Sequence, residues 1–388
     1  MTFQNISEAM RTLTPPNQNL SDAVQVRQEV DLRIGASFTR FQTLNLRYVL
    51  GYQSKQVLSY GPCQFPTLGF IVERYQEIKN FKPEDFWSLK MKVKRPSGVD
   101  GEEQVCELQW QRGKLFDEDA CCALLDACEE AKLATVTDVS KKQTRKFRPQ
   151  PLNTIEAQKL ISRKLKISPA QSMEIMEKLY NKGYLSYPRT ETNIYNKTIN
   201  LRDLVSKLEN AQDFGAFASR IASGEMWQGP RNGSQDDKSH PPIHPVKLAH
   251  ASELTGQEWA IYNLITRHFL GSLAKDAVGS ETTVKVEMGG EQFHASGLIV
   301  EQPNYLEVYT FDKWSDRYIP RFQQAEKFKP FSLTVQKGAT AAPTPLTEAD
   351  LITRMDQQGI GTDATIHEHI KTVQERGYAT KQGVYIVP

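Results

Sequence analysis

Residues 281–300, ETTVKVEMGGEQFHASGLIV, carry the strongest β pattern in the sequence. Apolar and polar residues alternate on both sides of Gly289-Gly290, a pair that suits the tight turn of a β-hairpin. The same alternation predicts strands in FWSLKMKVKRP (86–96) and AKLATVTDVSKK (131–142), and a hairpin in ELQWQRGKLF (107–116). Between these two β-rich blocks the sequence has helical character. We therefore expect a β domain into which a helical block is inserted.

Helical patterns also occupy both ends of the chain, so the predicted fold class is mixed α and β with several domains. A chain of 388 residues is long enough for roughly two to four domains. The predicted segments are a helical part at 1–84, a β-rich part at 85–146, a helical domain at 147–278, a second β-rich part at 279–344 and a second helical part at 345–388. In the first of these, residues 22–32 predict a helix that ends near Gly35.

Composition excludes several classes of protein. Hydrophobic residues make up 39% and charged residues 24% of the chain, which is typical of a globular protein and not of a disordered one. The sequence has no apolar run of membrane-spanning length and no apolar stretch typical of a secretory signal, so we expect no membrane association. Five cysteines without a C-x-x-C pair favour neither disulfides nor a zinc site and fit a reducing compartment.

The net charge is only +2, but the charges are unevenly distributed. Between Lys141 and Arg189 lie twelve Lys and Arg residues and three acids, a net +9, which leaves the rest of the chain near −7. Such a basic stretch suits a polyanion, most often the phosphate backbone of a nucleic acid. A solvated, lysine-rich surface explains the same composition equally well.

A faint internal repeat relates residues 153–188 to residues 346–388. Each copy begins with a helix cap and continues through a turn and a second helix to a Gly-Tyr pair; the caps are Asn153 with Glu156 and Thr347 with Asp350, and the pairs are Gly183-Tyr184 and Gly377-Tyr378. In the first copy, Ser168 and Pro169 cap a second helix whose predicted apolar face holds Met173, Met176, Leu179 and Tyr180. This is the order of a winged helix, a common nucleic-acid-binding fold, although many helical hairpins share it.

The most informative local sequence is LYNKGYLSYPRTETN (179–193). Pro188 disfavours helix at Tyr187, and in an extended segment Tyr187 and Arg189 point to the same side. A guanidinium beside a phenol favours the phenolate and can hold two phosphate oxygens. This spacing suits attack of a tyrosine on a phosphodiester to give a covalent phosphotyrosine. The pattern alone is weak, because most tyrosines next to prolines only pack in strands.

The segment SYPRTETN (186–193) resembles the active-site segment of type IA DNA topoisomerases, in particular of the topoisomerase III branch. Further segments match in the family's order: DAVQVRQEVDLRIGASFTRFQ (22–42), LSYGPCQFPTLGFIVERYQEI (58–78), RNGSQDDKSHPPIHPVK (231–247), NYLEVYTFDKWSD (304–316) and LTEADLITRMDQQGIGTDATIHEHI (346–370). HPPIHP, GPCQFPTLGF and GIGTDAT are most similar to the eukaryotic branch and its alpha type. The resemblance implies a toroid core with winged-helix-like helical domains and a β-rich gate or hinge domain.

The resemblance also implies roles for particular residues. Tyr187 would be the nucleophile that becomes joined to a 5′ phosphate, Arg189 would position that phosphate, and His240 falls on the family's active-site histidine. The residues expected to contact DNA are Arg27, Asp31, Gln64, Lys164, Lys166, Gly361 and Thr362, with Gly359 in the same turn as the last two. Arg27 and Asp31 also suit a simple helical ion pair, and Gly361 with Thr362 an ordinary helix cap. His367-Glu368-His369 is more typical of a solvated helix face than of a metal site.

In this family a Toprim domain supplies the Glu and the Asp-x-Asp that hold Mg²⁺. The resemblance begins after that domain and stops before the family's C-terminal region, so we expect a chain without either. Mg²⁺ is expected for the intact enzyme, with its ligands absent from this chain, and no ATP is needed. Asp117-Glu118-Asp119 lacks a preceding hydrophobic strand and is predicted to be a turn. The expected partners are single-stranded DNA, a RecQ-type helicase and an OB-fold scaffold protein, and the expected compartment is the nucleus.

Two alternatives belong to other functional classes. A non-catalytic, single-strand-binding fragment is favoured by the missing acidic cluster. A different tyrosine nuclease is disfavoured, because the sequence has neither the His-hydrophobic-His of rolling-circle initiators nor the His-x-x-Arg of tyrosine recombinases. The leading prediction is therefore a type IA topoisomerase core that cleaves one DNA strand, passes another and religates the break.

Overall fold

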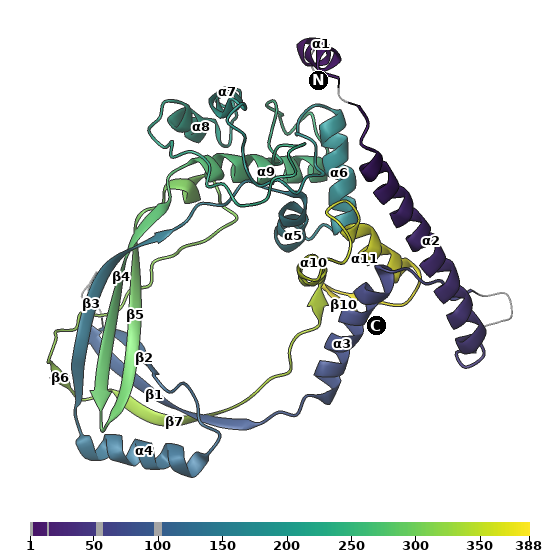
Figure 1. Cartoon of the computed structure of the whole chain (residues 1–388). Helices are drawn as coiled ribbons and strands as arrows, with labels where there is room; N and C mark the ends of the chain where they lie inside the picture. Colours follow the sequence, from purple (N-terminus) through teal and green to yellow (C-terminus); the bar gives the residue numbers. More distant parts are fainter. Residues whose placement is uncertain (1–2, 14, 52–56, 97–102) are drawn as a thin grey trace.

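A computed structural model describes residues 3–13, 15–51, 57–96 and 103–388, and its elements follow one another around a ring (Figure 1). A large sheet forms the left and lower part of the ring, and helices form the top and the right. No helix of the described residues is long and apolar enough to cross a membrane. The described cysteines are all free thiols.

The large sheet is antiparallel throughout and has the strand order β6-β3-β4-β5-β2-β1-β7. Its strands are β1 (Asp85–Pro96), β2 (Glu103–Trp110), β3 (Ala134–Lys146), β4 (Ala277–Met288), β5 (Glu291–Gln302), β6 (Lys327–Phe328) and β7 (Ser332–Ala339). The strands predicted at 86–96 and 131–142 and the hairpin predicted at 281–300 are confirmed. Gly289 and Gly290 both have positive φ, as a two-residue hairpin turn requires.

Two predictions at the lower end of the sheet are wrong. The chain does turn at Gly113, but Leu115 then pairs with Trp87 of β1 and makes no hairpin with β2. Both edges of β2 are already occupied, by β1 and by β5. The second wrong prediction is the turn at Asp117-Glu118-Asp119. Asp117 instead caps a helix, α4 (Glu118–Ala131), and its carboxylate accepts the Ala120 N–H at 2.9 Å. This helix packs against the sheet and buries Cys121 and Cys128 in the sheet's apolar core, while Cys122 is exposed.

The strands before and after the helical block share one sheet, so the predicted insertion is confirmed. The inserted helices are α5 (Thr154–Leu165), α6 (Pro169–Asn181), α7 (Leu201–Ser206), α8 (Gly215–Ala222) and α9 (Gly256–Leu273). They enclose an apolar core of their own, to which Met173, Met176 and Leu179 contribute. Tyr180 departs from the predicted apolar face, because it is 43% exposed.

The remaining helices lie on the right of the ring (Figure 1). They are α1 (Phe3–Arg11), α2 (Gln18–Leu46), α3 (Gln64–Asn80), α10 (Glu348–Gln357) and α11 (Ile366–Glu375); a short 3₁₀ helix, η1 (Asn304–Glu307), lies near α9. The predicted end of a helix at Gly35 is wrong, since α2 continues through it. An interior glycine costs only about 1 kcal/mol relative to alanine, too little to end so long a helix.

The internal repeat is present in the local geometry. Asn153, Ser168 and Thr347 cap α5, α6 and α10 as predicted. Each copy ends its second helix at a glycine of positive φ, followed by a tyrosine whose N–H returns to that helix: Tyr184 to Leu179 at 2.9 Å, and Tyr378 to Val373 at 3.1 Å. The second copy completes a three-stranded wing with β8 (Leu346–Thr347), β9 (Thr380–Gln382) and β10 (Tyr385–Val387).

The first copy has no such wing. Its strand positions pair instead with the segment that contains residues 243–245, through single bridges from Leu152 to Ile243 and from Leu185 to Pro245. This different pairing brings the distant loop 231–247 against the end of α6. It places His240 next to Tyr187.

Candidate active site

Tyr187 lies just beyond α6 and outside any helix or strand, as Pro188 predicts. The segment before it is tied to the 231–247 loop, because Ser186 donates its N–H to the carbonyl of His244 at 2.9 Å. The segment after it is tied to the start of α5. There the buried Thr154 hydroxyl lies 2.6 Å from the Pro188 carbonyl and accepts the Thr190 N–H at 2.7 Å. Tyr187 is therefore held from both sides by backbone contacts.

The Tyr187 ring is half-buried between two other rings. Tyr180 meets it edge-on at 5.3 Å between centroids, and His240 lies against it at 5.0 Å with an interplanar angle of 37°. The structure thus brings together Tyr187 and His240, two of the three predicted catalytic residues. Aromatic contacts of this kind favour particular relative orientations of the rings.

His240 is in turn held by Asp237. The Nδ1 atom of His240 lies 3.2 Å from Oδ2 of Asp237, while Oδ1 accepts the backbone N–H groups of Ser239 and His240, each at 2.8 Å. Burial opposes ionisation of this carboxyl, but the backbone N–H groups and the imidazole outweigh it and hold the pKa of Asp237 well below its usual range. The carboxylate is therefore ionised at neutral pH.

Arg189 connects the tyrosine segment to the other winged unit. Its Nε and Nη2 lie 2.8 Å and 2.6 Å from one oxygen of Glu177 on α6, and Nη1 donates to the Ala364 carbonyl at 2.9 Å. His367, predicted to be solvated, is buried instead, and desolvation lowers its pKa. Its position near Arg189 and Glu177 explains the difference, because α11 packs against α6 there.

Five of the predicted DNA contacts line a single groove of about 1400 Å³ between α2, α3 and α11. They are Arg27, Asp31, Gln64, Gly361 and Thr362. No ion pair joins Arg27 to Asp31 among the described residues, so the simple helical pair is not formed. Gln64 is 5% exposed, and its Nε2 has no hydrogen-bond partner while Oε1 accepts from Arg376. Ala364 belongs to the loop that lines this groove. The hydrogen bond from Arg189 to Ala364 therefore connects the groove to the segment that contains Tyr187.

Lys164 and Lys166 lie outside this groove, at the end of α5. Lys166 lines a separate cavity of about 130 Å³ beside α10. Several cations of the basic stretch pair with acids elsewhere in the chain, which are Glu281, Asp312, Asp276, Asp350 and Glu258. Counting along the sequence could not reveal these partners. The basic stretch is therefore not one continuous basic surface.

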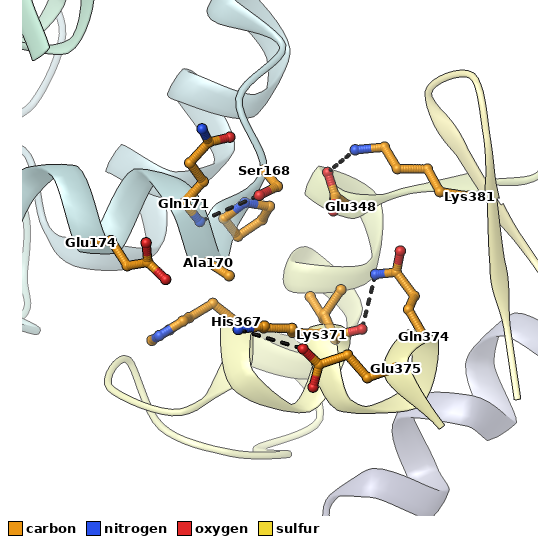
Figure 2. A pocket seen from close by; sticks show the side chains of 12 residues that line it. Ser168, Ala170, Gln171, Glu174, Glu348, His367, Lys371, Gln374, Glu375 and Lys381 are labelled. Atoms are coloured by element: carbon orange, nitrogen blue, oxygen red, sulfur yellow. Dashed lines mark hydrogen bonds and ion pairs between the residues drawn. The ribbon is translucent and has the colours of Figure 1, made fainter. Parts of the chain in front are cut away.

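The inserted helices contact the base, which consists of α2, α3, α10 and α11, through α5 against α10 and through α6 against α11. Ile155 of α5 joins the apolar cluster of α3, α10 and α11, and Arg163 lies 3.9 Å from Asp350. Beside this contact, a cavity of about 340 Å³ separates the N-terminus of α6 from α11. Figure 2 shows Gln171 and Glu174 on one wall and Lys371 and Gln374 on the other. Unfilled volume at a contact removes dispersion attraction, so the seam between α5–α6 and α10–α11 is less tightly packed beside this cavity than a protein core is.

Among the described residues, no three His, Cys, Asp or Glu side chains are grouped so as to hold a metal ion. His367 and His369 have no third ligand, and Asp117 is used as a helix cap.

Sequence reasoning missed three residues that shape this site: Asp237, Glu177 and Thr154. Asp237 carried a usable signal, since an aspartate three residues before a histidine can accept both that residue's N–H and its ring N–H. Glu177 and Thr154 carried none. Their partners lie 12 and 36 residues away, and only the packing of α5 and α6 brings them together.

Comparison with known proteins defines the class. The DNA topoisomerase family model matches residues 15–388, and the chain belongs to this family. The full-length topoisomerase I of Thermotoga maritima shares the fold, with a TM-score of 0.75 and 22% identity over 100% of this chain and 62% of that one. The ring of Figure 1 is accordingly the type IA topoisomerase toroid.

Within the family, the chain is similar to eukaryotic topoisomerase 3. It is 47% identical to DNA topoisomerase 3-alpha of Drosophila melanogaster and 46% identical to that of Homo sapiens, over 97% of this chain in both cases. Identity to DNA topoisomerase 3-beta of Drosophila melanogaster is 40%. The predicted resemblance, including the alpha type, is confirmed. The chain spans 30% and 37% of the length of the two 3-alpha proteins.

Proposed function

We propose that this chain is the strand-cleaving core of a type IA DNA topoisomerase. The observation that supports it best is the position of Tyr187. Its ring lies between Tyr180 and His240, and the nearby Arg189 contacts the loop of a groove lined by five predicted DNA contacts. A single DNA strand lying in that groove would pass along the loop that contains Ala364 and so reach Tyr187.

In the proposed step, Oη of Tyr187 attacks a backbone phosphorus. The Oη–P bond forms as the P–O3′ bond breaks, the phenol proton leaves, and the 3′ oxygen takes up a proton. The product is a 5′-phosphotyrosine. Arg189 would exchange Glu177 for the phosphate and stabilise the charge on its oxygens. Religation is the same step in reverse, so the bond energy is conserved and no nucleotide is consumed.

We place the gate at the seam between α5–α6 and α10–α11. Cleavage would leave one DNA end covalently bound to the inserted helices and the other held in the groove of the base. Separation at the seam would then open a path for a second strand, with the sheet acting as a hinge. The implied RecQ-type helicase, the OB-fold scaffold, the nuclear location and the roles in recombination and repair belong to the same proposal.

The test is a denaturing-gel adduct assay with labelled single-stranded DNA, with and without Mg²⁺. We expect a covalent adduct from the unaltered chain and none from Tyr187→Phe, with the Kd for DNA changed less than about twofold, because one hydroxyl is a small part of the interface. Tyr180→Phe is the matched control, since Tyr180 contacts the same ring, and it should keep the adduct.

An adduct that persists in Tyr187→Phe would show that another residue is the nucleophile. Binding without any adduct from the unaltered chain would favour the alternative, a single-strand-binding fragment that does not cleave DNA.

A further inference from the structure

We infer that Asp237 is the positioning residue of the site, which fixes the proton and the orientation of His240 beside Tyr187. The inference deepens the proposed function and rests on it. Its basis is the division of labour between the two carboxylate oxygens of Asp237. Oδ1 folds the loop by accepting the N–H groups of Ser239 and His240, and Oδ2 faces the Nδ1 atom of the His240 ring.

A carboxylate is an acceptor only, so the ring nitrogen that faces it must carry a hydrogen. In the neutral ring this leaves Nε2 as the free acceptor, and in the charged ring the carboxylate balances the imidazolium. The ring cannot rotate away without losing this bond and its contact with Tyr187. Asp237 thus sets which ring nitrogen can accept or donate a proton at the tyrosine.

The same carboxylate ties the histidine loop to the tyrosine segment. Thr190 lies three residues after Tyr187, and its hydroxyl is 3.4 Å from Oδ2. The backbone N–H of Asp237 is accepted by the Thr192 hydroxyl at 3.0 Å. Asp237 therefore links His240 to the segment that follows Tyr187, and it is mostly buried, with 19% of its side chain exposed.

Asp237→Asn is a near-isosteric test. An amide oxygen in place of Oδ1 can still accept both backbone N–H groups, so the loop is expected to keep its fold. The amide nitrogen in place of Oδ2 is a donor, so the facing Nδ1 must become an acceptor and the hydrogen must move to Nε2. Asp236→Asn is the matched control, because Asp236 accepts the Lys238 N–H at 2.8 Å and, among the residues that the structure describes, makes no contact with the His240 ring.

The first readout is independent of activity. The full chain is labelled with ¹⁵N-histidine and long-range ¹H–¹⁵N spectra are recorded near pH 8.5, above the usual histidine pKa of about 6.5. The chain has seven histidines, and His240→Gln assigns the signal. We expect Nδ1–H in the unaltered chain and in Asp236→Asn, and Nε2–H in Asp237→Asn. An unchanged tautomer in Asp237→Asn would overturn the inference.

The second readout is the rate of the Tyr187-dependent adduct. We expect a loss of at least about tenfold in Asp237→Asn, with DNA binding changed less than about twofold, because a wrong histidine tautomer impairs proton transfer and not binding. An inverted tautomer with an unchanged rate would overturn the role in cleavage. If the unaltered chain forms no adduct, the proposed function fails for this chain, and the tautomer alone decides whether Asp237 positions the ring.

Discussion

At the residue scale, the guanidinium of Arg189 holds the carboxylate of Glu177 at the place that the proposed mechanism assigns to a phosphate. Glu177 contacts two of the guanidinium nitrogens. The Arg189 side chain is 28% exposed and the Glu177 side chain is 36% exposed. A DNA phosphate must displace this carboxylate or approach beside it, and either event opposes binding. The third contact, to the Ala364 carbonyl, can persist in both cases.

The corresponding prediction concerns Glu177→Gln. The neutral amide competes less for the guanidinium and removes a like charge from the phosphate site. We expect the Kd for single-stranded DNA to fall about fivefold, equivalent to about 1 kcal/mol, in a fluorescence-anisotropy titration. Glu174→Gln, on the same helix but facing the seam cavity, should leave the Kd unchanged. Weaker binding in Glu177→Gln would mean that Glu177 is needed to hold Arg189 in place.

At the element scale, the patterns that the sequence revealed correctly are local ones. Alternation predicted β1, β3 and the β4–β5 hairpin, and capping residues predicted the starts of α5, α6 and α10. The helix α4 was missed although its signals are local too: Asp117 as a cap, two acids in the first turn, and Cys121 and Cys128 on one face. The sequence analysis predicts a turn at Asp117-Glu118-Asp119, whereas these three acids form the start of a helix.

The features that could not be predicted depend on packing between distant segments. The pairing of Leu115 with Trp87, the missing wing after α6 and the burial of His367 all follow from which edge or face was already occupied. The groove also depends on such packing, since its residues come from three separate stretches of the chain. The resemblance supplied these groove residues, and local physics would not have grouped them.

The β4–β5 turn offers a prediction about how elements fit together. A Cβ on Gly289 would lie 2.4 Å from the backbone oxygen of Ala127 in α4, whereas one on Gly290 would meet nothing within 4 Å. Both glycines have positive φ, so both alanine variants carry similar backbone strain of about 1 kcal/mol. Only Gly289→Ala should also displace α4, which we expect to be seen as faster amide exchange along Glu118–Ala131.

Gly290→Ala is the control for backbone strain, and its α4 exchange should match that of the unaltered chain. Equal exchange in the two variants would show that α4 is not held by the close approach at this turn.

At the scale of the whole molecule, the ring is joined by two pairs of connections. One pair leads from the sheet to α3 and β8. The other leads from β3 and β4 to the inserted helices, and it is closed by a buried ion pair. Nη1 of Arg148 lies 2.8 Å from Oδ1 of Asp276, which also accepts the Arg148 backbone N–H, and both side chains are less than one-tenth exposed. Any hinge motion of the sheet against the inserted helices acts across this pair.

Burial opposes ionisation of Asp276, but the hydrogen bonds and charge of Arg148 outweigh it and lower the pKa of Asp276. Because the folded-state pKa is depressed, the stabilisation is fully present above the unfolded value of about 3.9 and is lost as the pH falls through the lower, folded value. Removing one partner of a buried pair leaves the other charge uncompensated, at a cost of about 3 kcal/mol. Asp276→Asn should therefore loosen the junction at neutral pH, where the unaltered chain is firmly joined.

The measurement is amide exchange at residues 147–152 and 274–280, corrected for intrinsic rates. We expect Asp276→Asn to speed it by about a hundredfold at pH 7 while exchange in α10 and α11 stays unchanged. Asp138→Asn removes an exposed pair with Lys285 on the same sheet and should change little. Equal exchange in Asp276→Asn and the unaltered chain, or junction protection in the unaltered chain that declines already between pH 7 and pH 5, would contradict this account. In either case the hinge would have to be sought in the strands themselves.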